Sequence, residues 1–228
     1  MNIHLISPVI YIIFIEAIKF ASPCPNSKFM INCRKYHNIN LSFLSFIILC
    51  GISYSTYIDN KFSSLHNLAC LPYSQKNYIA IFSSKLFLYS KYIEWLDTLF
   101  IHLSNRKITM LQYTHHMTTA FLTYLNMDEF MSASYFIPTF LNTFVHVFMY
   151  LYFAFPKGVL FKFRSLITKI QIIQHVICLT AICYVLFFAT SCNTQTKYGA
   201  SFGLLLYGIY LYYFLEFYIS NYLIKKLK

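Results

Sequence analysis

A group of ionisable side chains lies within strongly apolar sequence between Lys91 and His116. Lys91, Glu94 and Asp97 fall within two helical turns, and two adjacent histidines, His115 and His116, follow in the next apolar run. A charged side chain at the centre of a membrane costs about 2.5–3.5 kcal/mol on insertion scales. Such residues need partners or a wet cavity, so we expect them to line a reaction chamber.

Four apolar segments carry polar residues at helical spacing, which places each set on one helix face. The sets are Lys91, Glu94, Asp97 and Thr98; Gln112, His115 and His116; Asn142, His146, Met149 and Tyr150; and Thr168, Gln171, Gln174 and His175. Taken singly, such residues are often interhelical contacts worth roughly 0.6 kcal/mol per pair. Four polar faces exceed what packing requires, and in a bundle they would turn inward and meet.

Three kinds of chemistry can be weighed for the histidines. A metal site is the least suited, because the histidines near the membrane are few and neighbouring side chains on a helix diverge by about 100°. We therefore expect no metal. Imidazole can instead exchange protons near neutral pH, or accept an acyl group from a thioester as a nucleophile. The residues by themselves leave these two roles open.

The composition predicts an all-α polytopic membrane protein. The 228 residues are 58% hydrophobic and only 11% charged, with a mean hydropathy of +0.54. The apolar runs are long and continuous, which argues against a β-barrel. The net charge of +11 could suggest nucleic acid. The basic residues fall between the apolar runs, however, so membrane lipids or an anionic, phosphate-bearing substrate are the expected partners, and nucleic acid is not.

We expect a single domain over residues 1–228 with seven transmembrane helices, each near the roughly 20 residues that a bilayer needs. The predicted spans are residues 3–20, 41–58, 77–103, 108–126, 132–153, 166–190 and 200–224. The first could be mistaken for a signal peptide, but it lacks a basic segment before its apolar run. We interpret it as a span.

Loop charge predicts a lumenal N-terminus and a cytosolic C-terminus, because basic residues gather in the loops of one side. Lys225 and Lys226 stand where a dilysine retrieval signal to the endoplasmic reticulum would be, although lysines beside a last span are also common by chance. Cys70 and Cys192 both fall in predicted lumenal loops. Such a pair can oxidise to a disulfide, and two unrelated free thiols are the alternative.

Four motifs resemble those of the very-long-chain fatty acid elongases, which are membrane 3-ketoacyl-CoA (3-oxoacyl-CoA) synthases. KYIEWLDT resembles the K-x-x-E-x-x-D-T motif, and QYTHH resembles the Q-x-x-H-H variant of the histidine box. NTFVHVFMYLYF and TKIQIIQ resemble the third and fourth motifs, and all four occur in family order. The chain departs from the family where Gln112 replaces the first histidine of the box and where His175 stands in place of a usual phenylalanine.

The resemblance implies that the last six of seven spans form a closed helical barrel around a chamber open to the cytosol. It implies condensation of malonyl-CoA with a long-chain acyl-CoA, releasing CO2 and CoA. His115 would be the nucleophile and form an acyl-imidazole. His146 would act as acid–base or orient the thioester. His116, Asn142 and Gln112 would hold the oxyanion and fix the imidazole tautomer.

The resemblance also implies substrate-binding roles for polar residues around the chamber. Arg106 and Lys107 would meet the CoA phosphates on the cytosolic rim. The remaining expected contacts are Lys91, Glu94, Asp97, Thr98, Met149, Tyr150, Gln171 and Gln174. No resident cofactor is expected, because the 3-ketoacyl product would pass to a separate reductase and the other elongation enzymes. A homodimer in the endoplasmic reticulum membrane is compatible with this interpretation.

Three alternatives stay open at this point. A seven-span transporter or receptor could use the polar stripes as a substrate or proton path. A different membrane acyltransferase could esterify an alcohol without malonyl-CoA. An inactive family member is the third, which the Gln112 substitution slightly favours. Neither the length nor the unsaturation of an acyl substrate follows from the sequence.

Overall fold

The computed structural model describes residues 2–71, 73–74, 76–127, 135–189, 192 and 194–224, and it is helical with no strand among them. The all-α prediction is thereby confirmed. The principal helices are α1 (Ser7–Ile18), α2 (Lys28–Ile58), α4 (Tyr78–Ile93), α5 (Trp95–Leu103), α6 (Met110–Asn126), α7 (Phe136–Ala154), α8 (Arg164–Cys183) and α9 (Thr194–Tyr218). The short elements are η1 (Lys61–Ser63), α3 (Leu65–Cys70), η3 (Val159–Phe163) and two π-helical turns, η4 (Tyr184–Phe188) and η5 (Ile219–Leu223).

Four helical stretches of the described residues are long and apolar enough to cross a membrane, which indicates a membrane protein. They are Lys28–Ile58, Phe136–Ala154, Val159–Phe188 and Thr196–Leu223. The first predicted span differs most from expectation. α1 has 12 residues, which rise about 18 Å, whereas the hydrocarbon core of a bilayer is about 30 Å thick.

The second predicted span, 41–58, begins later than the helix that the structure shows there. α2 starts at Lys28, thirteen residues before the expected start at Leu41. The Ser27 side chain caps the helix by accepting a hydrogen bond from the Met30 backbone N–H at 3.3 Å. This first part of α2 is polar and basic, so its hydropathy gives no membrane signal, although it packs on the bundle through residues such as Asn38.

The third predicted span, 77–103, is divided at Glu94 into α4 and α5. The backbone N–H of Asp97 donates to the Glu94 carbonyl at 3.0 Å, three residues back instead of four. Such a tight turn inside a helix changes the direction of the side chains that follow it. Glu94 is thus placed at the break itself, in the middle of the polar motif.

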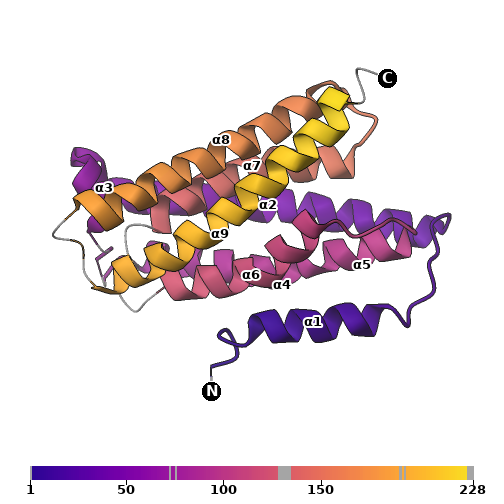
Figure 1. The fold of residues 1–228 in the computed structure, drawn as a ribbon, viewed down its shortest axis with the longest axis horizontal. Helices are drawn as coiled ribbons and strands as arrows, with labels where there is room; N and C mark the ends of the chain where they lie inside the picture. The colour runs from indigo at the N-terminus through magenta and orange to yellow at the C-terminus, as the bar shows by residue number, and fades with distance from the viewer. Residues whose placement is uncertain are drawn as a thin grey trace.

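The long helices pack in a continuous cycle (Figure 1). α2 packs against α4 and α7, α4 against α6, α6 against α9, α9 against α8, and α8 against α7. In this cycle α6 and α7 lie on opposite sides. α1 stands apart at one edge of the molecule and packs against α5 and α6. The polar faces of α4, α6, α7 and α8 therefore belong to helices of one cycle.

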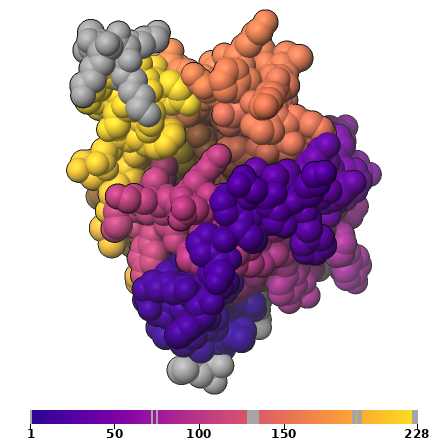
Figure 2. Space-filling model, turned by 90° about the vertical axis from the view of Figure 1, so that its right-hand side faces the viewer, coloured from indigo at the N-terminus to yellow at the C-terminus, as the bar shows by residue number. Residues whose placement is uncertain are grey.

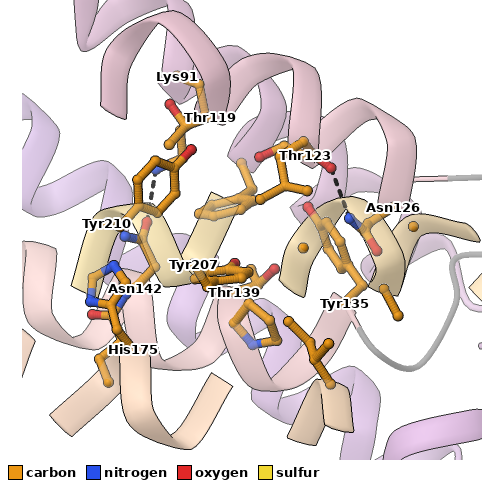
Figure 3. A pocket seen from close by; sticks show the side chains of 18 of the residues that line it. Lys91, Thr119, Thr123, Asn126, Tyr135, Thr139, Asn142, His175, Tyr207 and Tyr210 are labelled. Carbon is orange, nitrogen blue, oxygen red and sulfur yellow. Dashed lines mark hydrogen bonds between the residues drawn. The ribbon is translucent and has the colours of Figure 1, made fainter. Parts of the chain in front are cut away.

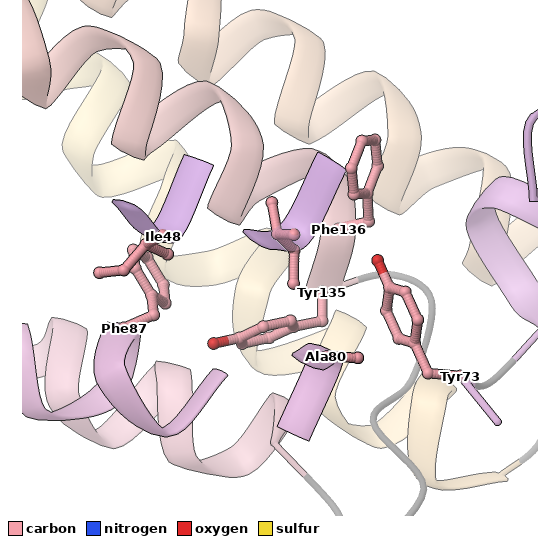
Figure 4. Close-up of a cluster of buried hydrophobic side chains, with 7 residues drawn as sticks. Ile48, Tyr73, Ala80, Phe87, Tyr135 and Phe136 are labelled. Carbon is pink, nitrogen blue, oxygen red and sulfur yellow. The ribbon is translucent and has the colours of Figure 1, made fainter. Parts of the chain in front are cut away.

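At one end of the bundle, apolar packing and a covalent link join the described elements. A cluster of buried side chains from α2, α4, α7 and the segment before α4 includes Ile48, Phe87 and Tyr135 (Figure 4). Nearby, Cys70 at the end of α3 and Cys192 before α9 form a disulfide. Of the two alternatives left open by the sequence, the structure has the disulfide. We call this the disulfide end.

Candidate functional site

A cavity of about 620 Å³ lies within the cycle of helices. Most of the side chains singled out from the sequence line this wide cavity: Glu94, Asp97, Arg106, Lys107, Gln112, His115, His116, Asn142, His146, Met149, Tyr150, Gln171 and Gln174. They come from α4 to α8 and from the connections between them, and the fold brings them to one space. Gln171 donates a hydrogen bond to the Met149 sulfur at 3.4 Å, which ties the α7 and α8 stripes together.

A network of buried polar groups joins α4 to α7 on one wall. Lys91 Nζ donates to Glu94 Oε1 at 2.7 Å and to Asn142 Oδ1 at 2.8 Å. Asn142 Nδ2 donates in turn to His146 Nε2 at 3.1 Å, and His146 Nδ1 lies 3.5 Å from Glu94 Oε1. This pattern places the His146 proton on Nδ1, facing the carboxylate. Lys91 and Glu94 are each only 2% exposed, so each satisfies the other's charge away from water.

Asp97 forms a second buried cluster next to this network. Its Oδ1 lies 2.9 Å from His37 Nε2, and its Oδ2 accepts a hydrogen bond from the Tyr150 hydroxyl at 2.8 Å. His37 was not predicted as a site residue, because it lies in a predicted loop between the first two expected spans. The helical spacing of Arg34, His37 and Asn38 was the signal that could have placed it on a polar helix face.

Thr98 does not line this cavity. It is fully buried, and its hydroxyl is 2.9 Å from that of Tyr11 on α1. The structure therefore brings the other sequence-predicted residues of this motif to the cavity walls and leaves Thr98 in a helix–helix contact. α1 packs outside the cycle of helices and contacts the site through Tyr11. The Tyr11 ring stacks on His116, with ring centroids 6.4 Å apart.

The adjacent histidines of α6 have different surroundings. His116 is buried, accepts a hydrogen bond at Nε2 from Gln112 Nε2 at 2.9 Å, and has its carbonyl bound by the indole N–H of Trp95 at 3.0 Å. The half-buried His115 imidazole has no hydrogen bond among the described residues and lies 5.1 Å from the Tyr210 ring, centroid to centroid. His115 thus presents an imidazole to open space, while His116 is held at Nε2, and its buried Nδ1 has no hydrogen-bond partner among the described residues.

Figure 3 shows the lining of a second, smaller cavity of about 50 Å³. It shares residues with the wide cavity and extends toward the disulfide end, because Tyr135, Ile182 and Ala200 also line it. His115, Asn142, Gln174 and His175 line both, so these residues mark the passage between the two cavities. Lys91 faces this inner chamber, together with Tyr207 and Tyr210 of α9. Sequence reasoning missed both tyrosines, because α9 is rich in aromatic residues all round and shows no polar stripe.

The mouth of the wide cavity is basic. Arg34, Arg106, Lys107 and Arg164 line it from α2, the α5–α6 connection and the start of α8. Arg34 donates to the Ser104 hydroxyl at 2.9 Å, which fixes its guanidinium at the rim. In Figure 2, which looks at this end of the molecule, the surface is hollowed between α8, α9 and the segment that joins α5 to α6. An anionic group entering here would meet up to four cationic side chains.

Fold and site together define a helical membrane protein with a histidine-lined internal cavity and a basic mouth. Among the described residues, no group of three or more His, Cys, Asp and Glu side chains is arranged to hold a metal ion. The chain belongs to the ELO family, described as the GNS1/SUR4 family, which it matches over residues 1–228. The resemblance of the four motifs is thereby confirmed.

Two relatives of the chain are named as fatty acid elongases, in agreement with this family. The chain is 32% identical over 169 residues to fatty acid elongase sre1 of Dictyostelium discoideum, which is 73% of this chain and 63% of that protein. It is 26% identical over 202 residues to fatty acid elongase A of the same organism, covering 84% of this chain and 73% of the relative. The chain thus spans slightly less than two thirds of the length of sre1.

Proposed function

We propose that this protein is the condensing enzyme of fatty acid elongation, a very-long-chain 3-oxoacyl-CoA synthase that joins malonyl-CoA to a long-chain acyl-CoA and releases CO2 and CoA. Family membership and the names of the relatives support fatty acid elongation in general. The observation that carries the finer proposal is the position of His115. Its imidazole has no hydrogen bond among the described residues and stands where the wide cavity passes into the inner chamber.

In this proposal the imidazole of His115 attacks the thioester carbonyl carbon of the acyl-CoA. The carbon–sulfur bond breaks, the CoA thiolate leaves with the electron pair and takes up the imidazole proton, and an acyl-imidazole remains. Malonyl-CoA then loses CO2, and the electron pair left on its α-carbon attacks the acyl carbon. The carbon–nitrogen bond breaks with its electron pair going to the imidazole nitrogen, which takes up one proton from solvent. His115 is thereby restored as a neutral imidazole, and a 3-ketoacyl-CoA is released.

The other residues of the wide cavity have supporting roles in this scheme. Asn142 faces the passage from α7, His146 lines the wide cavity beside it, and the two orient the thioester. Gln112 with His116 fixes the turn of α6 that carries His115. The ammonium of Lys91 is already neutralised by Glu94, so we assign this pair to the framework of the site. Asp97, Met149, Tyr150, Gln171 and Gln174 complete the walls, and Arg106 and Lys107 receive the CoA phosphates at the mouth.

The scheme also extends to the arrangement in the membrane. We propose that α2, α4 with α5, and α6 to α9 act as a six-helix barrel, with α1 outside it and the basic mouth toward the cytosol, where CoA esters are available. The disulfide end then faces the oxidising lumen of the endoplasmic reticulum, in keeping with the Cys70–Cys192 bond. Lys225 and Lys226 lie outside the described residues. A retrieval role predicts that changing both lysines to serine lets the protein leave the endoplasmic reticulum, and unchanged residence would exclude it.

The deciding experiment measures CO2 release from carboxyl-labelled malonyl-CoA by membranes that hold the protein, with and without a series of acyl-CoAs. We expect release that requires acyl-CoA, yields 3-ketoacyl-CoA, and needs no added cofactor. The product accumulates unless a 3-ketoacyl-CoA reductase is supplied. CO2 release that does not depend on acyl-CoA would exclude a condensing enzyme. The absence of CO2 release with every acyl-CoA tested, from protein shown to be folded, would exclude it as well. Ester formation from an alcohol would indicate a different acyltransferase, and substrate uptake without chemistry would indicate a transporter.

A further inference from the structure

The inner chamber is lined by more polar groups than an apolar chain can use. α6 contributes Thr119, Thr123 and Asn126 to its walls, and Thr139 of α7 and Tyr135 directly before α7 also line it. Thr119 lies one helical turn beyond His115 and Thr123 two turns, which is about 6 and 12 Å along the helix. These oxygen atoms therefore line the path that an acyl chain would take beyond the passage.

The free hydroxyls here differ from other threonines of the same helices. Thr118 and Thr143 each donate to the carbonyl four residues back, both at 2.7 Å, as threonines in membrane helices commonly do. The buried hydroxyl oxygens of Thr119 and Thr139 have no such bond and no other hydrogen-bond partner among the described residues. The Tyr135 hydroxyl donates to the Ser84 carbonyl at 3.3 Å, and its oxygen also lies within reach of the Thr139 hydroxyl, so Thr119 is the more clearly unpaired of the two threonines.

His175 adds an acceptor at the entrance of the chamber. Its Nδ1 lies 2.6 Å from the Gln171 carbonyl, a contact that only a protonated nitrogen can make, so the proton is on Nδ1. Nε2 then carries a lone pair, and the ring is packed among Tyr207, Tyr210 and Phe214. This side chain lines both cavities, so a group passing His115 also passes His175.

The cost of leaving such groups unpaired decides what fits the chamber. A buried donor or acceptor without a partner costs about 1–3 kcal/mol. A cavity of about 50 Å³ is large enough for roughly three or four waters, which would satisfy these groups. A chain of methylene groups displaces such waters without replacing their hydrogen bonds, whereas a chain with a hydroxyl group replaces some of them.

We infer that the inner chamber selects acyl chains that carry a hydroxyl group, with Thr119, Thr139 and His175 as its hydrogen-bond partners. This inference rests on the proposed function, because it takes the chamber as the path of the acyl chain. The hydroxyl of such a chain can donate to His175 Nε2 or to a threonine oxygen and can accept from a threonine hydroxyl, so it restores part of the hydrogen bonding that the displaced waters provided.

The test compares the unsubstituted acyl-CoA with acyl-CoAs of the same length that carry one hydroxyl, moved carbon by carbon along the chain. We expect the best hydroxylated chain to have a kcat/KM about tenfold above that of the unsubstituted chain. Thr119→Val, Thr139→Val and His175→Phe should each bring this ratio toward one. Thr143→Val is the matched control, since Thr143 is a buried threonine one turn from Thr139 that does not line either cavity, and it should leave the ratio unchanged.

A ratio of one or less in the unmodified protein would overturn the inference while leaving the condensing activity in place, as would a ratio that the three variants do not change. A second measurement determines the Kd of unreactive thioether analogues of the same acyl-CoAs and compares the unsubstituted chain with the hydroxylated ones. If no chain is condensed, the proposed function fails, and the Kd ratio still decides whether the chamber prefers a hydroxyl.

Discussion

Two walls of the wide cavity differ in how their polar groups are satisfied. On the α4–α7 wall, Lys91, Glu94, Asn142 and His146 bind one another and leave no charge without a partner. On the α6 wall, the imidazole of His115 has no hydrogen-bond partner among the described residues. A satisfied network holds a shape, whereas an unpartnered imidazole keeps its lone pair for a substrate. The comparison separates the groups that support the site from the one placed to react.

The largest effect should come from removing the unpartnered histidine. We expect His115→Ala to lower the rate of condensation by roughly four orders of magnitude, because a covalent step is lost. His116→Ala should cost only about 10- to 100-fold, as a residue that positions its neighbour. The measurement is acyl-CoA-dependent CO2 release, with folding checked by thermal unfolding in detergent. Equal losses for the two variants would contradict the assignment.

A strong effect on stability should follow when the satisfied wall is broken. Glu94→Gln leaves the Lys91 ammonium buried without its carboxylate, and breaking a buried pair costs about 3–5 kcal/mol of unfolding free energy. Adding Lys91→Met removes the stranded charge and should restore part of the loss. The control is Glu16→Gln, which breaks the exposed Lys19–Glu16 pair at 2.6 Å and should have little effect. Equal losses for Glu94→Gln and Glu16→Gln in denaturant titrations would refute the argument.

A smaller effect should follow when His116 loses the hydrogen bond to its Nε2 and, like His115, has an imidazole without a side-chain partner. Gln112→Leu removes the donor to His116 Nε2, and we expect about a tenfold loss of kcat with an altered pH dependence. Gln112→His restores a donor at the same position and should keep kcat within about threefold of the unmodified protein. Steady-state rates over a pH series provide the measurement. Identical pH profiles for all three proteins would show that Gln112 does not act through His116.

The smallest effect concerns Lys61, a buried lysine at the disulfide end. Unlike Lys91, which is paired with Glu94, it should make the stability of the protein depend on pH. Lys61 donates to the Leu71 carbonyl and lies over the Tyr73 ring, 4.3 Å from its centroid. Among the described residues, no carboxylate forms an ion pair with it. Burial lowers the pKa of Lys61 to about 8. The folded state then binds fewer protons than the unfolded state above about pH 8, so stability rises with pH from there toward 10.5, the ordinary pKa of lysine.

The measurement for Lys61 is the slope of the unfolding temperature between pH 7.5 and 9.5. We expect Lys61→Met to remove part of the rise that the unmodified protein shows, because methionine does not titrate. Lys76→Met is the control, since Lys76 is exposed in the same segment and its loss should leave the slope unchanged. A slope that is the same in all three proteins would mean that Lys61 keeps its charge when the protein folds.

The sequence by itself predicted an all-α membrane protein, its family and most of the cavity wall. Apolar runs report helices in a membrane because backbone groups must be satisfied within each segment. Helical spacing then placed Lys91, His115, Asn142 and Gln171 on inward faces before any contact was known. Residue type and local periodicity were sufficient for these predictions, since both are properties of a short stretch of chain.

Only the tertiary structure decided which of these groups has a partner. His115 and His116 are neighbours in sequence, and their difference depends on Gln112, Tyr11 and Tyr210 from three separate helices. The polar start of α2, the break at Glu94 and the unpaired hydroxyls beyond His115 likewise depend on packing between distant segments. A hydrogen bond needs two groups at a fixed distance, and that distance is set by how the helices meet.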